Sequence, residues 1–347
     1  MGQQDAGRTG PRLRVLQSFH RPKATTNPYV TQLLEGLRTG ADVETYGSRQ
    51  ALLGRYDVLH VHWPEVVVTR SRWWARVVAA AVFWGALRRT VLTGAAVVRT
   101  VHNVTPHEPP DLLTRLVLAE CDRRTTWWVR LNDETPTPPG APVTTVLHGD
   151  YRAWFADVPR RSPVRGRLAY VGLVRPYKGV EDLVDVVAAL PDPEVSLTVS
   201  GRPSTGEDLA AELRRRAHDD PRIALDLRHL DEAEIVGAVS AAELVVLPYR
   251  RMHNSGAALL ALSLDRPVLV PRNAVTDALA AEVGERWVQR YDGDLDAAAV
   301  EKALAAVRAD AGDGGPDLTQ RGWDAIAAQH LDVYRAAVAR RRGARRR

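Results

Sequence analysis

The stretch Glu243–Pro271, ELVVLPYRRMHNSGAALLALSLDRPVLVP, decides the fold. It opens with a short apolar run, Leu244–Leu247, and closes with a second one, Pro267–Val270. The residues between them, Asn254–Leu264, have the length and apolar content of a helix. Two buried strands joined by a helix are the repeating unit of a parallel sheet, so this stretch predicts an α/β fold.

The same alternation continues along the rest of the chain. Val- and Leu-rich runs are typical of buried parallel strands: Leu13–Leu16, Val58–Val61, Val97–Val101, Val143–Leu147, Leu168–Val171, Ser196–Val199 and Ala224–Leu227. Longer runs with a period of 3.6 residues predict helices: Pro28–Arg38, Arg72–Arg88, Pro110–Cys121, Val180–Ala189, Asp208–His218, Asp231–Val239 and Val275–Val283. Strands that alternate with helices throughout indicate a parallel α/β architecture.

A break in this alternation divides the chain. The segment 151–163 is rich in proline and arginine and has no clear period, and strands resume at Leu168. We therefore expect two Rossmann-like parallel-sheet domains facing a cleft, an N-terminal one over residues 12–155 and a C-terminal one over residues 168–320, joined by a linker over 156–167. A disordered N-terminus over 1–11, a last helix over 321–340 and a basic tail over 341–347 complete the expected organisation.

Composition and charge exclude several classes of protein. The 347 residues carry a formal net charge of +5, and six arginines lie in the last eight residues. The single cysteine, Cys121, excludes a disulfide framework and favours a reducing compartment. The sequence lacks a signal peptide, an apolar run long enough to span a membrane, a nucleic-acid motif, a dinucleotide fingerprint, a phosphate-binding P-loop and a hydrolase elbow.

Ligands of parallel sheets bind beyond the carboxyl ends of the strands, so the residues that follow each strand are the candidates for function. The helix that starts at Asn254-Ser255-Gly256 presents free backbone N–H groups, which suit an anion such as a diphosphate. The basic loop after Val171 holds Arg175 and Lys178, which can neutralise the same anion. An ordinary helix cap and a solvated loop charge are the alternative interpretations.

These segments resemble the C-terminal half of the GT-B glycosyltransferases, close to the family 4-type group, over roughly residues 12–335. Lys178-Gly179 match the loop after the first strand of that domain, where Arg175 lies two residues beyond the usual arginine position. Three further segments match: Val199-Ser200-Gly201, Val246-Leu247-Pro248, and Asn254 through Val268. The resemblance implies these donor-binding residues: Arg175, Lys178, Gly201, Arg202, Tyr249, Asn254, Ser255 and Gly256.

The chain departs from that group at two positions. Retaining members carry two glutamates, and the aligned positions here are Met252 and Leu260. Retention of anomeric configuration is therefore not carried over. The segment from Asn254 to Pro267 is similar to a bacterial exopolysaccharide subgroup that lacks the glutamates, with Asp265 in its glycine position. That similarity favours GDP-mannose as donor and inversion of configuration.

The N-terminal half supplies the acceptor side in this fold. Its strand-end loops hold His20, Asn27 and Asn103, which we expect on the acceptor side. An acceptor hydroxyl that attacks an anomeric carbon needs a general base, and the candidates are Glu65, His102 and Glu108. A loop contact or helix cap is the alternative for each. Two groups of possible metal ligands occur in the sequence. The pair His60 and His62 has no evident third ligand, and the carboxylates of Asp292, Asp294 and Asp296 do not lie at the expected cleft. We therefore expect no metal and no cofactor.

No acidic residue occurs between Val66 and His107, and that interval holds six arginines and four aromatic side chains. Tryptophan and arginine suit the headgroup region of a membrane. We therefore expect a peripheral protein on the inner, cytoplasmic face of the bacterial plasma membrane, with a water-exposed core helix as the alternative. The expected activity is sugar transfer from a nucleoside diphosphate sugar to a lipid-linked oligosaccharide or glycolipid. The alternatives are a nucleotide-sugar epimerase of the same fold or a non-catalytic relative that binds nucleotide sugars.

Overall fold

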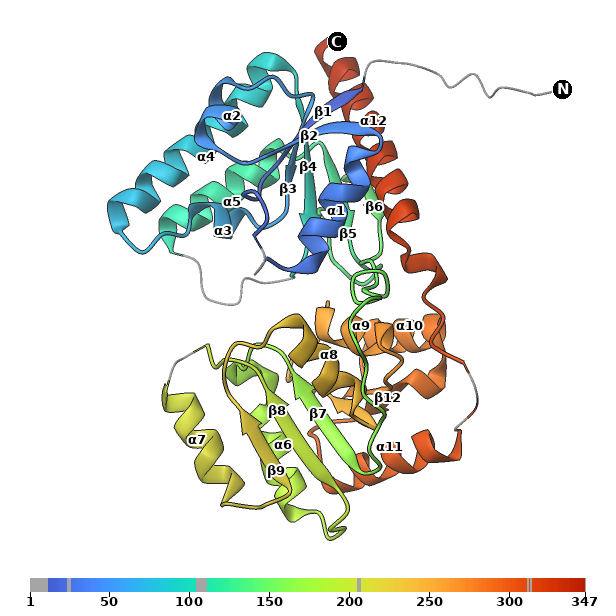
Figure 1. Cartoon of the computed structure of the whole chain (residues 1–347). Coiled ribbons are helices and arrows are strands. Elements are labelled where there is room, and N and C mark those ends of the chain that lie inside the picture. The colour runs from blue at the N-terminus through green and yellow to red at the C-terminus, as the bar shows by residue number, and fades with distance from the viewer. Residues whose placement is uncertain are drawn as a thin grey trace, which may run out of the picture. The chain divides into compact units, whose positions relative to one another are not determined.

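A computed structural model describes residues 12–23, 26–103, 111–204, 207–310, 312 and 314–346. The chain forms two compact units, which are described separately (Figure 1). Unit 1 comprises Met1–Gly149 together with Arg321–Arg347, and unit 2 comprises Asp150–Gln320. The expected disordered segment, residues 1–11, lies outside the described residues.

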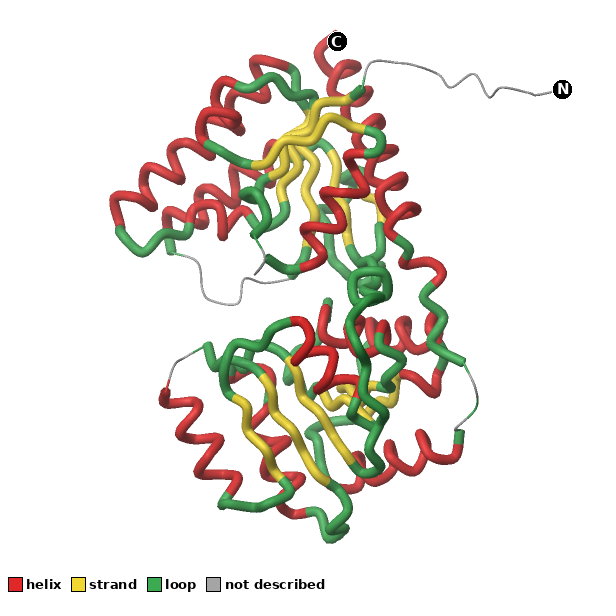
Figure 2. Tube along the Cα trace, in the orientation of Figure 1, coloured by secondary structure: helices red, strands yellow, loops and turns green. Residues whose placement is uncertain are grey.

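Unit 1 contains a six-stranded parallel sheet in the order β2-β1-β3-β4-β5-β6 (Figure 2). Its strands are β1 (Leu13–Gln17), β2 (Ala41–Thr45), β3 (Val58–Val61), β4 (Ala96–Val101), β5 (Trp127–Arg130) and β6 (Val143–Thr145). Its helices are α1 (Pro28–Arg38), α2 (Ser48–Leu53), α3 (Pro64–Val68), α4 (Trp73–Thr93), α5 (Leu112–Arg124) and α12 (Trp323–Arg346).

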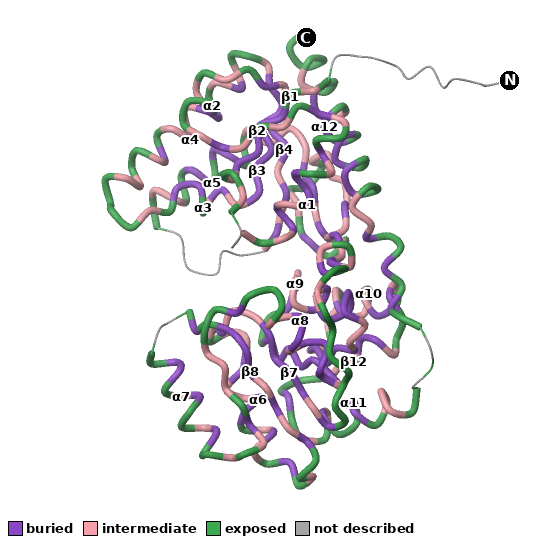
Figure 3. The backbone as a smooth tube through the Cα atoms, viewed as in Figure 1, coloured by how far each residue is buried: buried purple, intermediate pink, exposed green. Residues whose placement is uncertain are grey.

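The two faces of this sheet pack against different helices, because successive side chains of a strand point to opposite faces. Val58, Ala96 and Val98 pack with apolar residues of α1 and α12 in one core cluster. Leu59 and Val97 pack with residues of α2, α3, α4 and α5 in another. Figure 3 shows the strands and the inward sides of these helices as buried. The last helix of the chain is therefore part of the core of unit 1.

Unit 2 contains a second six-stranded parallel sheet in the order β12-β11-β10-β7-β8-β9. Its strands are β7 (Arg167–Val171), β8 (Ser196–Ser200), β9 (Ile223–Asp226), β10 (Leu244–Val246), β11 (Val268–Pro271) and β12 (Val288–Tyr291). Its helices are α6 (Val180–Ala189), α7 (Glu207–Ala217), α8 (Glu232–Ser240), α9 (Gly256–Ser263), α10 (Ala274–Val283) and α11 (Ala297–Ala309), with the short 3₁₀ turns η1 (Pro176–Lys178), η2 (Glu285–Trp287) and η3 (Thr319–Arg321).

The direction of winding reverses once in each sheet. In unit 1 the chain runs from β1 to β2 on one side and then returns to β3 on the other side of β1. In unit 2 it runs from β7 through β8 to β9 and then returns to β10 on the other side of β7. Such reversals open a crevice at the carboxyl ends of the two strands concerned, where open α/β sheets bind ligands. The fold thus singles out the ends of β1 and β3, and of β7 and β10.

The expected fold class, two parallel-sheet units, is confirmed. The boundaries differ in two places. Tyr151 and Phe155, which were expected in the N-terminal domain, belong to the core of unit 2. Arg161 of the expected linker donates its backbone N–H to Ser240 Oγ at 2.9 Å, so the linker is also attached to unit 2. Helix α12 continues past Arg340 to Arg346 and so includes most of the expected tail. Over the described residues, no helix combines the length and apolarity needed to cross a bilayer.

Candidate functional site

Lys178 lies at the carboxyl end of β7, where the winding of unit 2 reverses. It is the last residue of the turn η1, and its backbone N–H donates to the Arg175 carbonyl at 2.9 Å, which closes the turn. The ammonium nitrogen lies 4.8 Å from the ring centre of Tyr249 and 5.9 Å from that of Tyr170. Burial, and then the charge of Arg175, lower the pKa of Lys178 to about 8. The free protein thus holds a poorly solvated cation that an anionic ligand would stabilise.

Glycine is required where the ends of β7 and β8 meet. Gly201 has a φ of 143°, and a Cβ there would overlap the Gly172 carbonyl oxygen. The Gly172 N–H donates to the Ser200 carbonyl at 3.0 Å, which holds the two strand ends together. Gly172 itself has a φ of 133°, and its Cβ position would face the Lys178 ammonium. The backbone beside Lys178 is therefore bare, and a ligand can approach it closely.

Helix α9 starts next to this lysine, at the carboxyl end of β10. Ser255 caps the helix, since its Oγ accepts from the Ala258 N–H at 3.2 Å. Tyr249 connects the two features, because it contacts Lys178 and forms a hydrogen bond with Ser255. Gly179, which follows Lys178, also lies against the carbonyl of Pro248, in the loop between β10 and α9. Lys178 and the α9 start therefore lie in one place, as the sequence predicts for an anion site.

The other donor-side residues lie around this pair. Arg175 is half-buried and caps η1, whereas Arg202 is exposed and its carbonyl accepts from the Val174 N–H at 3.0 Å. Asn254 is half-buried in the loop before α9. Gly256 opens α9 with its Cβ position 3.2 Å from the Tyr151 hydroxyl, so little room exists for a side chain.

A cavity of about 650 Å³ lies at the carboxyl ends of β10, β11 and β12 and is lined in part by Tyr249, which contacts Lys178. Tyr249 and Tyr291 form apolar walls, and the carboxylates of Asp182 and Asp294 supply hydrogen-bond acceptors. Arg250 donates to Asp182 at 2.9 Å, which holds one of these carboxylates in place. Its position beside Lys178 and its polar acceptors suit the hydroxyl groups of a sugar or ribose.

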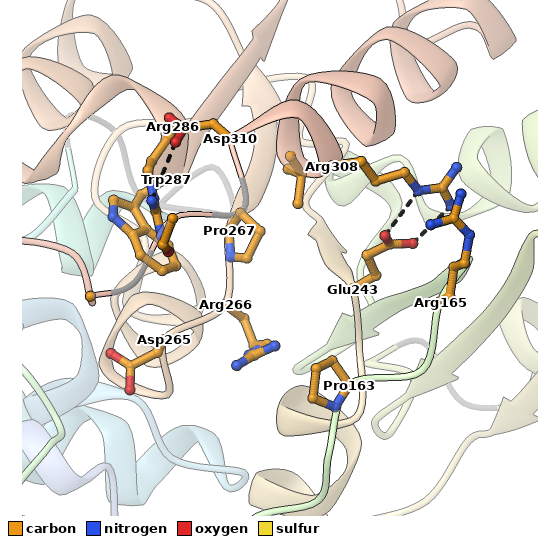
Figure 4. A pocket seen from close by; sticks show the side chains of 13 residues that line it. Pro163, Arg165, Glu243, Asp265, Arg266, Pro267, Arg286, Trp287, Arg308 and Asp310 are labelled. Carbon is orange, nitrogen blue, oxygen red and sulfur yellow. Dashed lines mark hydrogen bonds and ion pairs between the residues drawn. The ribbon is translucent and has the colours of Figure 1, made fainter.

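A second cavity, of about 500 Å³, lies at the opposite, amino-terminal edge of the same strands (Figure 4). Glu243 accepts two hydrogen bonds from Arg308, both at 2.9 Å, and one from the Gly166 N–H at 2.5 Å. Arg286 pairs with Asp310 at 3.4 Å. These charges neutralise one another within the fold, and parallel sheets bind ligands at the other edge. We assign this cavity a structural role.

A buried polar network occupies the reversal point of unit 1. Gln17 ends β1, His62 follows β3 and His102 follows β4. His62 Nδ1 lies 3.1 Å from His102 Nε2, and His62 Nε2 lies 2.9 Å from Gln17 Oε1. The His102 ring stacks on Trp63, with ring centres 3.9 Å apart. The network therefore places the His102 imidazole at the strand-end edge, with its orientation fixed by His62 and Trp63.

The same network extends inward to α12. The Gln17 amide nitrogen donates to the Tyr334 hydroxyl at 3.2 Å, and that hydroxyl lies 2.7 Å from His60 Nδ1. His60 Nε2 lies 2.8 Å from Thr100 Oγ1. Burial is the largest cause that lowers the pKa values of His60, His62 and His102, with that of His62 falling to about 3. These imidazoles are therefore neutral at physiological pH.

Three further acceptor-side candidates, His20, Asn27 and Asn103, lie in loops that follow strands of unit 1. His20 is exposed, and its Nδ1 lies 3.0 Å from the Tyr46 carbonyl. The side chain of Asn27 caps α1 by accepting from the Tyr29 N–H at 3.0 Å. Asn103 is half-buried directly after His102, and Glu108 lies outside the described residues.

Glu65, the remaining candidate base, belongs to a different part of unit 1. Burial raises the pKa of Glu65, and the charge of Arg99 opposes that rise. Arg99 pairs with Asp122 of α5. Glu65 therefore lies toward the face of the sheet that α5 covers, whereas His60 contacts α12 on the opposite face.

Sequence reasoning missed Gln17 and Tyr334 as partners of the histidines, and considered His60 and His62 as metal ligands or as ordinary core or loop histidines. The position of Gln17 was a usable signal, because it directly follows the predicted strand Leu13–Leu16 as His62 follows the predicted strand Val58–Val61. Within the described part of the chain, no group of three or more histidine, cysteine or carboxylate side chains is arranged to hold a metal ion.

Comparison with known proteins identifies the family. No protein-family model matches the chain. Over 329 residues the chain is 44% identical to a protein of Xanthomonas campestris pv. campestris named GDP-mannose:glycolipid 4-beta-D-mannosyltransferase, a match that covers 94% of this chain and 93% of the relative. A second protein with that name from the same pathovar matches to the same extent. This identity, over nearly the whole of both chains, is far above what a shared fold alone produces.

Solved structures support the same fold. The catalytic domain of starch synthase IV from Arabidopsis thaliana matches with a TM-score of 0.63, at 12% identity, over 94% of this chain and 99% of that one. HepE of Anabaena in complex with UDP-glucose matches with a TM-score of 0.62, at 14% identity, over 94% and 98% of the two chains. At such identities the likeness concerns the fold alone. With the extended match to the Xanthomonas relatives, it follows that this chain is a GT-B glycosyltransferase and belongs to the family of the GDP-mannose:glycolipid 4-beta-D-mannosyltransferase.

Proposed function

We propose that this protein transfers a mannosyl group from GDP-mannose to a hydroxyl group of a glycolipid, in the synthesis of a bacterial surface polysaccharide. The observation that carries the proposal is the joint position of Lys178 and the α9 start, connected through Tyr249, in a chain 44% identical to a GDP-mannose:glycolipid mannosyltransferase. A buried cation beside a helix N-terminus suits a diphosphate group.

In this proposal the residues of unit 2 stabilise the leaving group. Lys178 and Arg175 neutralise the diphosphate, and the free N–H groups at the start of α9 donate to its oxygens. The bond between the anomeric carbon and the diphosphate oxygen breaks with its electron pair on that oxygen, so the negative charge there increases as the reaction proceeds. Donors fixed in advance stabilise that charge without having to reorganise. This arrangement supplies the electrostatic stabilisation from the chain's own groups, so the proposal requires no metal.

We further propose that the reaction inverts the anomeric configuration. The two positions aligned with the donor-site glutamates of retaining relatives are Met252 and Leu260. Met252 is buried in the core of unit 2, and its carbonyl accepts from the Asn273 amide at 2.9 Å. Leu260 packs against the same core. Both side chains are apolar and pack in the core, so neither position supplies a carboxylate that could contact the donor sugar. This supports a reaction by a single displacement, in which the acceptor attacks the anomeric carbon directly.

An apolar patch on unit 1 suggests how the protein reaches a lipid acceptor. We call it the tryptophan patch; it comprises side chains of α3 and α4 that are between 48% and 75% exposed, Val66, Trp73, Trp74, Val77 and Val78. Leu112 and Leu116 of α5, which packs against α4, add 73% and 51% exposed side chains. Arg70, Arg72 and Arg115 lie in the same segments. Tryptophan beside arginine suits the interface of an anionic membrane, so we propose peripheral binding there, on the cytoplasmic face.

A transfer assay tests the enzymatic proposal. The purified protein is incubated with GDP-mannose and glycolipid extracted from the membrane of a bacterium that makes such a polysaccharide, and the mannosylated product is identified by mass spectrometry. UDP-glucose and UDP-galactose serve as donor controls. We expect product from GDP-mannose with the β configuration, and loss of product in Lys178→Ala. A product with the α configuration contradicts inversion, and conversion of the donor sugar without acceptor indicates an epimerase instead.

A vesicle assay tests the membrane proposal separately. The full chain is sedimented with vesicles that contain phosphatidylglycerol, at low salt. We expect the double variant Trp73→Ala, Trp74→Ala to lose most of its binding. Leu92→Ala is the matched control, because Leu92 is 79% exposed on the same helix but lies at its other end. Equal binding of the wild type and the double variant contradicts the assignment of the tryptophan patch.

A further inference from the structure

The buried network of unit 1 is a single row of hydrogen bonds from the strand-end edge to the interior. Five consecutive contacts of 3.1, 2.9, 3.2, 2.7 and 2.8 Å join its members in this order: His102, His62, Gln17, Tyr334, His60 and Thr100. Four segments far apart in the sequence contribute to it, namely the ends of β1, β3 and β4 and the middle of α12. A row of this kind has a definite direction, because each member donates to the next.

The amide of Gln17 sets that direction. It presents its nitrogen to Tyr334 and its oxygen to His62, so the proton between Gln17 and His62 resides on His62 Nε2. A neutral imidazole carries only one proton, and His62 Nδ1 is therefore an acceptor. The group that donates to it, at 3.1 Å, is His102 Nε2–H. Neutral His102 then has its basic lone pair on Nδ1.

The inner half of the row agrees with this direction. Tyr334 accepts from the Gln17 amide and donates its hydroxyl proton to His60 Nδ1, so the proton of neutral His60 resides on Nε2 and is donated to Thr100. Every donor in the row thus has one acceptor. Reversal would require Gln17 to turn over and His62, His102 and His60 to change tautomer together. The state of His102 is fixed by groups that lie well behind it.

We propose that His102 is the general base of the transfer reaction and that His62 and Gln17 are positioning residues that hold its basic atom at Nδ1. This inference rests on the proposed function. In the step, the acceptor oxygen forms a bond to the anomeric carbon of the mannosyl group, and the bond from that carbon to the diphosphate oxygen breaks with its electron pair on the diphosphate. The proton of the acceptor hydroxyl moves to His102 Nδ1.

Two observations favour His102 over the other described candidate, Glu65. His102 lies directly after β4 at the strand-end edge and is held between the stacked Trp63 ring and His62. Glu65 lies toward the α5 side of the sheet, near Arg99. The tautomer of a catalytic histidine is commonly set by the partner of its other nitrogen, and an imidazole in that role must be neutral to accept a proton. Burial keeps His102 in that neutral form by lowering its pKa.

Substitutions at His62 distinguish positioning from packing. His62→Leu removes the acceptor for His102 Nε2–H, whereas the amide oxygen of His62→Asn can replace Nδ1 as acceptor. We expect His62→Leu to lower kcat about 100-fold, the lower end of the contribution of a general base, with KM for donor and acceptor unchanged within about threefold. We expect His62→Asn to keep kcat within about tenfold of the wild type. An equal loss in both variants overturns the positioning role.

His330→Leu is the matched control for these variants. His330 is as deeply buried in unit 1 and lies 5.6 Å from His60 by ring centres, but it takes no part in the row, since its Nδ1 bonds to the Ile326 carbonyl. We expect its kcat to be that of the wild type. Melting temperatures and stabilisation by GDP-mannose confirm that each variant is folded. A folded His62→Leu protein with the kcat of the wild type overturns the inference.

The pH profile of Gln17→Glu supplies a second measurement. A carboxylate at this position favours the protonated form of the His62–His102 pair, so we expect the acid limb of kcat/KM to move to higher pH by about one unit or more. The titratable groups that face the pair belong to β3, α1, the segment after β6, and α12: His60, Tyr29, His148 and His330. An unshifted acid limb in an active Gln17→Glu variant overturns the inference.

The wild type is measured in the same experiments, so a failure of the proposed function and a failure of the inference about His102 give different results. Transfer from GDP-mannose by the wild type, together with full kcat in folded His62→Leu, overturns the role of the row and leaves the proposed function standing. Absence of transfer by the wild type, with no stabilisation by GDP-mannose, overturns the proposed function itself.

Discussion

Replacing Lys178 by methionine should stabilise the free protein while it removes donor binding. Burial and Arg175 lower the pKa of Lys178 from 10.5 to about 8. Since one pKa unit corresponds to about 1.4 kcal/mol, the charged ammonium costs the free protein about 3 kcal/mol at neutral pH. Methionine has a similar length and no charge, but it gives up the contact with the Tyr249 ring. We therefore expect a gain of about 1 to 3 kcal/mol.

The gain should depend on pH in a defined way. A cation whose pKa is lower in the folded state than in the unfolded state destabilises the folded state, and it does so fully below the lower pKa. For Lys178 the cost is complete below about pH 8, shrinks as the pH rises toward 10.5, and vanishes above that value. The difference in stability between Lys178→Met and the wild type should therefore be largest at neutral pH and close in the alkaline range.

Calorimetry with and without GDP-mannose measures both effects. A stabilisation of 1 kcal/mol raises the melting temperature by about 2 to 4 °C for a domain of this size. At a concentration 100 times its Kd, GDP-mannose should add about 2.7 kcal/mol to the wild type and far less to the variant. Lys178→Arg keeps the charge, and Lys302→Met removes an exposed lysine of α11; neither should stabilise the free protein. A Lys178→Met protein that melts below the wild type refutes the reasoning.

Three further substitutions test other features by chemical denaturation. Gly201→Ala should destabilise unit 2 by more than about 3 kcal/mol, because its Cβ would overlap the Gly172 carbonyl; a stable variant would show that the strand ends can separate. Asp265 has a φ of 56° after α9, so Asp265→Gly should be tolerated better, by about 1 kcal/mol, than Asp265→Ala, and the reverse order would contradict the backbone argument. His330 Nε2 is buried with no partner among the described residues, so His330→Leu should stabilise unit 1 by about 1 kcal/mol; a loss of that size would show that His330 has a stabilising contact.

The inner strands other than β5 could be predicted from sequence because they are buried on both faces. Runs such as Val58–Val61 are apolar throughout and coincide with β3. The edge strands β2 and β12 were missed, since an edge strand is only partly covered and its sequence includes polar residues, as in Ala41–Thr45. The strand β5 and the helices α2, α3 and α11 were also missed; α2 and α3 are too short for a period of 3.6 residues to be recognised.

The donor side of the candidate site could be predicted from sequence more completely than the acceptor side. Lys178 and Ser255 lie in the segments that connect β7 and β10 to the next helix, so the rule about strand ends was sufficient to find them. The acceptor-side network could not be found in that way, because His60 and Tyr334 are 274 residues apart and only the tertiary packing of α12 brings them together. Asp265 illustrates a different limit: the resembling subgroup has glycine at this position, but only the structure shows that Asp265 itself adopts the left-handed backbone conformation.

The contribution of α12 to unit 1 has a consequence for the order in which the protein folds during synthesis. Residues 12–149 leave the ribosome first, but their sheet lacks α12, one of the two helices that cover one face, with Ile326 and Tyr334 of the core. That helix is made only after the whole of unit 2. Although domains generally fold in the order of their synthesis, we expect unit 2 to complete its fold before unit 1. Until then the nascent chain exposes the apolar part of this sheet face that α12 will cover, which is a natural binding site for chaperones.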